Sequence, residues 1–125
     1  MVRTLVLADS SIWIDHINKG DALLAELLKQ KRVVLHPMVL GEIAMGSLRQ
    51  RKIILEELRQ LPIVSSASNA EVMAMVEWHQ LHNKGVGFVD AHLLASVHLI
   101  QNARLLTRDK RLHAQALRLG VAYAP

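Results

Sequence analysis

The sequence predicts an α/β fold in which a parallel sheet is covered by helices on both faces. Short apolar runs such as Leu5–Ala8 lack the polar alternation of a half-exposed strand and are typical of strands buried on both sides. Segments with the apolar spacing of helices follow these runs, so that strands and helices alternate along the chain. The chain has 125 residues, of which 51% are hydrophobic, and we expect one domain over residues 1–125.

Five short apolar segments have the features of strands. They are residues 5–8, 33–35, 63–64, 105–107 and, as a last edge strand, 121–123. One or two helix-like segments separate each from the next. Helical crossovers, which are right-handed, are the usual connection between neighbouring parallel strands. The sheet should therefore be parallel.

Seven segments carry the caps, stops and apolar spacing of helices. They comprise a helix through Ile12 that breaks near Gly20, one capped by Asp21, one from Pro37 through Ala44, one over about Gln50–Leu61, one from the capping box Ser68–Glu71 that ends before Gly85, one through Ile100 with Asp90 in its first turn, and one from Asp109 to Gly120. Glu42 lies within the third of these helices.

Composition excludes several kinds of chemistry. The chain has no cysteine, which rules out disulfides, thiolate nucleophiles and zinc-thiolate or iron-sulfur sites. Its apolar runs are too short for a secretory core or a membrane helix, so we expect a soluble, cytoplasmic protein with no membrane partner. The formal charge of +4 favours a polyanionic partner. Aromatic residues make up only 3% of the chain, so few side chains can stack on nucleic-acid bases. If RNA binds, phosphate contacts should carry most of the affinity.

Four acidic residues are expected to meet at one edge of the sheet. Asp9 and Asp109 each follow a predicted strand, and ligands of an open parallel sheet bind beyond the carboxyl ends of its strands. Asp90 and Glu42, in the helices named above, can reach the same edge. Carboxylates that are brought together repel one another, and Mg²⁺ or Mn²⁺, which prefer oxygen ligands, would offset that repulsion. Taken singly, each Asp is explained as a helix cap and Glu42 as a solvated helix residue, so only their joint placement predicts a site.

Four segments, in order along the chain, closely resemble the PIN domain of VapC toxins. They are Val6–Ile14 (VLADSSIWI), Leu40–Ile43 (LGEI), Gly87–Ala95 (GFVDAHLLA) and Leu105–Leu112 (LLTRDKRL). The resemblance implies a PIN-like fold, a three-layer α/β/α sandwich with a parallel central sheet. It also implies an endoribonuclease that depends on Mg²⁺ or Mn²⁺, is neutralised by a VapB-type antitoxin and forms a homodimer.

The resemblance also implies roles for individual residues. The acidic quartet of the family falls on Asp9, Glu42, Asp90 and Asp109. Asp9 and Asp90 are expected to bind metal directly, while Glu42 and Asp109 complete the shell or orient water, with Asp109 acting directly or through water. The hydroxyl beside the site falls on Ser11, or alternatively on Ser10, and a second hydroxyl falls on Thr107.

Cationic residues near the acids are candidate contacts to RNA phosphates. They are Arg49, Arg51 and Lys52 after the Glu42 helix, and Arg108, Lys110 and Arg111 around Asp109. A solvated surface explains each of them equally well.

Several other residues have simpler explanations. His79 and His82 are expected on one helix without a zinc-protease pattern, whereas His92, two residues after Asp90, merits a test. Packing is the simpler role of four larger side chains: Trp13, Met73, Met75 and Trp78. Asp15 and Asp21 resemble an exposed helix residue and a cap.

Three other functions compete with a nuclease. A response-regulator receiver needs an acidic pair after its first strand, and a haloacid-dehalogenase-type phosphatase needs a second Asp where this chain has Ser11. The stronger alternative is a catalytically silent PIN-like module that binds a partner or nucleic acid in a toxin-antitoxin complex. An apolar surface on the first helix or on the 50–61 helix could receive an antitoxin helix or a second copy.

Overall fold

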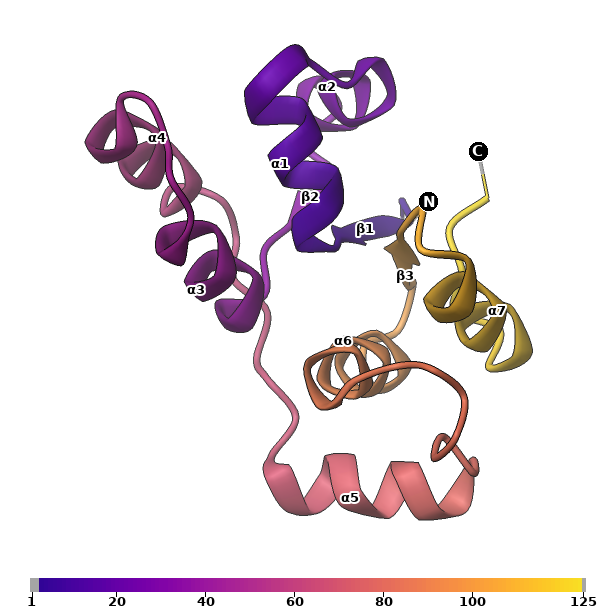
Figure 1. Cartoon of the computed structure of the whole chain (residues 1–125). Helices are drawn as coiled ribbons and strands as arrows, with labels where there is room; N and C mark the ends of the chain where they lie inside the picture. The colour runs from indigo at the N-terminus through magenta and orange to yellow at the C-terminus, as the bar shows by residue number, and fades with distance from the viewer. Residues whose placement is uncertain (1–2, 125) are drawn as a thin grey trace.

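A computed structural model describes residues 3–124 and has a three-stranded parallel sheet at its centre (Figure 1). Strand β1 (Leu5–Ala8) lies between β2 (Val33–Val34) and β3 (Ala103–Leu106). The register pairs Leu7 with Val34 on one side and Ala8 with Leu106 on the other. The carboxyl ends of β1 and β3 therefore coincide.

Seven helices surround this sheet within the described residues. They are α1 (Ser10–Lys19), α2 (Ala22–Lys29), α3 (Pro37–Met45), α4 (Arg51–Leu58), α5 (Asn69–Trp78), α6 (Phe88–Leu99) and α7 (Lys110–Arg118). In Figure 1, α1 and α2 lie on one side of the sheet and α6 lies on the other with α5 beneath it. This arrangement confirms the predicted α/β/α architecture. None of the helices in residues 3–124 has the length and hydrophobicity required to cross a bilayer.

Four of the five predicted strands are shorter or displaced. The strand expected at 33–35 covers only Val33–Val34. The segments 63–64 and 121–123 form only single bridges, Ile63 with Leu35 and Ala122 with Leu105, both parallel. The strand expected at 105–107 begins two residues earlier, and Thr107 lies just beyond its end. The edge segments pair on one side only, which limits the number of hydrogen bonds that hold them extended.

Two helices end earlier than the sequence indicates. The helix expected over 50–61 covers only Arg51–Leu58. Helix α5 stops at Trp78, because Gln80 adopts a left-handed conformation and the Leu81 N–H donates to the Val76 carbonyl, a Schellman-type ending. The expectation that His79 and His82 share a helix was therefore wrong. No glycine marks this ending, so sequence alone did not reveal it.

The core extends from the sheet through α6 to α5. Seven consecutive residues of α6, Ala91–Val97, are buried, because this helix is covered by the sheet on one side and by α5 on the other. The buried residues of α6 include the polar side chains of His92 and Ser96, and buried polar groups need hydrogen-bond partners. Ser96 hydrogen-bonds to the imidazole of His36, and Asn69 hydrogen-bonds to that of His92.

His36 is a fully buried imidazole at the start of α3. Its Nδ1 accepts a hydrogen bond from the Met38 N–H at 3.0 Å, and its Nε2 lies 3.1 Å from Ser96 Oγ. Since Nδ1 is an acceptor, the neutral ring carries its proton on Nε2. Burial, and secondarily the nearby His92, lower the pKa of His36 to about 4.

We expect acid to destabilise the protein through His36. Between pH 6.5, its ordinary value, and about 4, the unfolded chain binds a proton that the folded chain excludes, so the free energy of unfolding falls as the pH falls. Urea denaturation at several pH values should show this slope in the wild type. His36→Asn can still cap α3 and should flatten the slope, whereas the matched change at the exposed His82 should preserve it. Equal slopes in His36→Asn and wild type would contradict the assignment.

Candidate active site

Asp9 is buried at the point where β1 meets α1, with 7% of its surface exposed. It is the N-cap of α1, and its Oδ1 accepts hydrogen bonds from Ser11 Oγ at 2.7 Å and from the Ile12 N–H at 3.2 Å. Its Oδ2 accepts a hydrogen bond from the Thr107 hydroxyl. These donors provide hydrogen-bond partners for a carboxylate that would otherwise be costly to bury.

Thr107 joins two of the acidic residues. Its Oγ1 donates to Asp9 and accepts a hydrogen bond from the Asp109 N–H at 3.1 Å. Asp109 is itself the N-cap of α7, where its Oδ1 accepts from the N–H groups of Arg111 and Leu112, both at 3.0 Å. Asp9 and Asp109 thus begin two helices at the same edge of the sheet, linked through one hydroxyl.

Asp90 lies in the first turn of α6 and is half-buried. Its Oδ2 accepts a hydrogen bond from the Gly87 N–H at 3.2 Å. Burial raises the pKa of Asp90, the Gly87 N–H opposes this, and the charges of Asp109 and Asp9 raise the pKa further. The three Asp side chains therefore share one acidic region.

The turn before α6 also contacts α7. Gly85 has a φ of +77°, and a Cβ atom there would overlap the side chain of Arg111. This close approach brings the segment that leads to Asp90 against the start of the helix capped by Asp109. Any larger residue at position 85 would have to displace the Arg111 side chain.

Unlike the three Asp residues, which lie at or near helix N-termini, Glu42 lies in the middle of α3. It is exposed on α3 and makes no hydrogen bond or ion pair with the other three acids in the part of the chain that the structure describes. Helix α3, which carries Glu42, packs against α1, which begins next to Asp9. Ser10, the alternative to Ser11, begins α1, and no bond from its hydroxyl to Asp9 is present among residues 3–124.

The three Asp side chains have the chemistry of ligands for a hard divalent cation. A carboxylate can accept about four hydrogen bonds or metal bonds. Asp9 accepts three hydrogen bonds, Asp109 two and Asp90 one, so each keeps free oxygen lone pairs. No three acidic or histidine side chains of residues 3–124 are already gathered as a complete set of ligands. A cation would therefore have to draw these carboxylates closer together, and it would relieve their mutual repulsion.

Two of the candidate phosphate contacts are occupied within the chain. Arg108 forms an ion pair with Asp21 and lies 3.7 Å from Asp15, and Arg51 donates two hydrogen bonds to the Ala44 carbonyl at the end of α3. The other candidates, Arg49, Lys52, Lys110 and Arg111, are exposed. Of these, Lys110 and Arg111 lie next to Asp109.

The burial of several other residues differs from what the sequence indicates. Asp21 is buried rather than an ordinary exposed cap, and its partner Arg108 is 87 residues away, so no local signal could have revealed the pair. His92 is buried, and its Nε2 lies 3.0 Å from Oδ1 of Asn69 on α5. Trp78 is 84% exposed and does not serve packing in this chain, whereas Trp13 is buried as expected.

Two apolar grooves lie away from the acidic residues. One, of about 320 Å³, is lined by residues of α1, α2 and α4, including Trp13 and Ile54. The other, of about 400 Å³, lies between α5 and α6 beside Trp78 and Leu99. Apolar linings of this kind suit a protein surface better than RNA.

Comparison with known proteins connects this geometry to a family. The PIN domain model matches residues 6–117. A relative with 43% identity over 120 residues is ribonuclease VapC32 of Mycobacterium tuberculosis, present in strains CDC 1551 / Oshkosh and ATCC 25618 / H37Rv, with 96% of this chain and 97% of the relative aligned. The structure of FitAB bound to an IR36 DNA fragment aligns over 94% of this chain and 92% of its own, with a TM-score of 0.62 and 14% identity, which is a likeness of fold alone.

Thr107→Val should destabilise the protein more than Ser11→Ala. The first change removes a donor to the buried Asp9 and the acceptor for the Asp109 N–H, and leaving such groups without partners costs about 1–3 kcal/mol. The second removes a hydrogen bond from an exposed residue, worth about 0.5–1.5 kcal/mol. Urea denaturation of both variants measures the difference. An equal or smaller loss for Thr107→Val would show that this hydroxyl does not organise the acids.

Proposed function

Because the chain belongs to the PIN domain family and, within it, to the VapC ribonucleases, we propose that it is a metal-dependent endoribonuclease toxin. The observation that carries the proposal is the shared acidic region of Asp9, Asp90 and Asp109 at the carboxyl ends of β1 and β3. Carboxylates in one region repel one another, and a cation that joins them would relieve that repulsion. A role as helix caps alone would not require them to lie near one another.

Mg²⁺ or Mn²⁺ is the proposed cofactor, held by Asp9 and Asp90, with Glu42 and Asp109 completing the shell or orienting water. The chemistry that such an ion supplies when bound is activation of a water and stabilisation of the leaving oxygen in phosphodiester hydrolysis. The chain contributes the orientation of the ligands. Ser11 and Thr107 hold the Asp9 carboxylate on both oxygens, which supports a fixed position for the first ligand.

RNA is the proposed substrate, bound through its phosphates. Lys110 and Arg111 are exposed at the start of α7 beside Asp109, and Arg49 lies in the loop after α3. Cations in these places would bind the phosphate backbone of RNA and would explain the excess positive charge of the chain.

A VapB-type antitoxin is the proposed partner. The groove lined by α1, α2 and α4 has the apolar character that an amphipathic antitoxin helix requires. We also propose a homodimer, for which the exposed Trp78 and Leu99 beside the second groove provide apolar surface.

We expect the purified protein, free of antitoxin, to cleave a mixed RNA pool in the presence of Mg²⁺ or Mn²⁺. EDTA should abolish cleavage, and Asp9→Asn should reduce it at least a hundredfold, because Asn can still cap α1 but carries no charge for the ion. Asp15→Asn is a matched control with the same chemical change outside the site. If neither metal supports cleavage by the wild type, and calorimetry detects no metal binding, the catalytic proposal fails and a silent partner-binding module is left.

Metal should stabilise the folded protein, and Asp90→Asn should remove that effect. At about 100 times its Kd, a ligand that binds only the folded state contributes about 2.7 kcal/mol. Without metal, Asp90→Asn should be slightly more stable than wild type, because a like charge is removed while an acceptor for the Gly87 N–H remains. Thermal unfolding with and without Mn²⁺ tests both parts. Equal Mn²⁺ stabilisation of the two proteins would exclude Asp90 as a ligand.

A further inference from the structure

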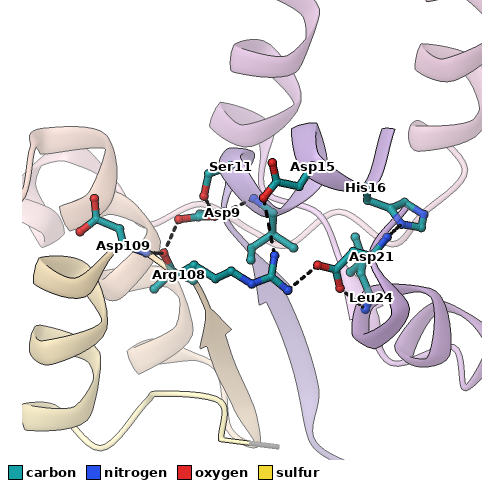
Figure 2. Close-up of polar contacts among 10 residues, drawn as sticks. Asp9, Ser11, Asp15, His16, Asp21, Leu24, Arg108 and Asp109 are labelled. Carbon is teal, nitrogen blue, oxygen red and sulfur yellow. Dashed lines mark hydrogen bonds and ion pairs between the residues drawn. The ribbon is translucent and has the colours of Figure 1, made fainter. Parts of the chain in front are cut away.

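Arg108 lies between Thr107 and Asp109 in the sequence, but its side chain extends away from Asp109 and toward Asp21 (Figure 2). Its neighbour Thr107 bonds to Asp9, and its other neighbour Asp109 caps α7. The Arg108 side chain itself extends to the turn between α1 and α2, where Nη2 donates to Asp21 Oδ2. Its Nη1 is 3.7 Å from Asp15 on α1, a weak contact between two half-exposed groups.

Asp21 is built into the fold as a buried anion. Only 7% of its side chain is exposed. Its Oδ1 accepts the Leu24 N–H at 2.9 Å as the cap of α2, and its own N–H donates to His16 Nδ1 at 3.0 Å. The Leu24 N–H and then Arg108 lower the pKa of Asp21 against the opposing effect of burial, so that it is charged at neutral pH. Its second oxygen is thereby directed at Arg108.

We propose that Asp21 and Arg108 form a clamp that holds residues 107–109 in place beside Asp9. Asp21 is then a positioning residue for the nuclease site, which it does not touch. This inference rests on the proposed nuclease function, since the clamp acts by placing Thr107 and Asp109.

The clamp follows from the way that this short segment is attached. The strand β3 ends at Leu106 and α7 begins at Lys110, so residues 107–109 lack regular backbone pairing. Side chains replace it: Thr107 is tied to α1 through Asp9, and Arg108 is tied to the start of α2 through Asp21. Both attachments end on the α1–α2 side of the sheet, so the segment is held at two neighbouring points. A charge-assisted hydrogen bond to a buried carboxylate that also caps a helix is a more rigid attachment than a bond between exposed side chains.

The alternative is that Arg108 binds an RNA phosphate, as its place beside Asp109 suggests. Its pairing with a buried carboxylate argues against that role, because the charge is already neutralised within the chain. The two roles predict different kinetics. If Arg108 binds phosphate, Arg108→Gln raises KM and lowers the salt dependence of binding, while Asp21→Asn frees the cation and leaves KM unchanged or lower. If the pair is a clamp, the same defect results whichever partner is removed.

The first test needs neither metal nor RNA. Hydrogen exchange at the Asp109 N–H, which is bonded to Thr107, should be at least tenfold faster in Asp21→Asn and in Arg108→Gln than in wild type, with the Leu7 N–H of β1 as an internal reference. Asn still caps α2, so Asp21→Asn should remain folded. Arg108→Gln leaves the buried charge of Asp21 without its partner. If that variant is unstable, the double variant Asp21→Asn/Arg108→Gln takes its place, because it has no unpaired charge. Asp15→Asn serves as the matched control and should exchange like wild type. Unchanged exchange at Asp109 in both clamp variants would overturn the proposal.

The second test uses RNA cleavage. Asp21→Asn, Arg108→Gln and the double variant should all lower kcat about tenfold, with KM within twofold of wild type, because the same clamp is broken in each. Arg108→Lys keeps a cation for Asp21 and should recover part of kcat. A raised KM in Arg108→Gln alone, or additive losses in the double variant, would overturn the clamp. If the wild type itself does not cleave RNA, the nuclease proposal fails, and hydrogen exchange alone then decides whether the clamp exists.

Discussion

The register of β1 against β3 is the constraint on which the candidate site depends. Because the strands are parallel and Ala8 pairs with Leu106, the residues that follow each strand emerge side by side at one edge. Asp9 and Thr107 are those residues, and their hydrogen bond joins positions 98 apart in the sequence. Helices α1 and α7 then begin from the same edge, so their positive N-terminal ends both face the acidic region. A shift of one residue in this register would separate the two side chains.

Capping and cation binding are compatible uses of the same carboxylates. Asp9 and Asp109 are helix caps in this structure, as the simpler interpretation of the sequence held. Each cap uses only part of the hydrogen-bonding capacity of its carboxylate, and the remaining lone pairs point to a second role. The caps and helix dipoles also offset the mutual repulsion of the acids when no cation is present. Burial is the main cause of the raised pKa of Asp90, and the charges of Asp109 and Asp9 raise that pKa further.

The chain separates its acidic region from its apolar grooves. The acids lie where helices begin at the edge of the sheet, whereas the grooves lie between helices that pack side by side, one beside α4 and one between α5 and α6. A partner in either groove would leave the acids reachable by RNA unless it also extended over them. The buried His36 and His92 belong to neither region; they supply hydrogen bonds in the middle of the molecule, where α6 is covered on both sides.

The sequence by itself determined the alternation of strands and helices and the caps at Asp9, Asp21, Ser68 and Asp109, because each depends on residues within one or two turns. The parallel sheet was predicted from that alternation, because helical crossovers join parallel strands. Four motifs together identified the family. Only the tertiary structure decided where α5 ends, that Trp78 is exposed, and that Asp21 is buried and paired with Arg108. The metal-binding role of the acidic quartet, Glu42 included, stays a prediction. The physical reason for this division is distance along the chain: caps and apolar periods are local, whereas burial and ion pairs depend on segments that meet only when the sheet has formed.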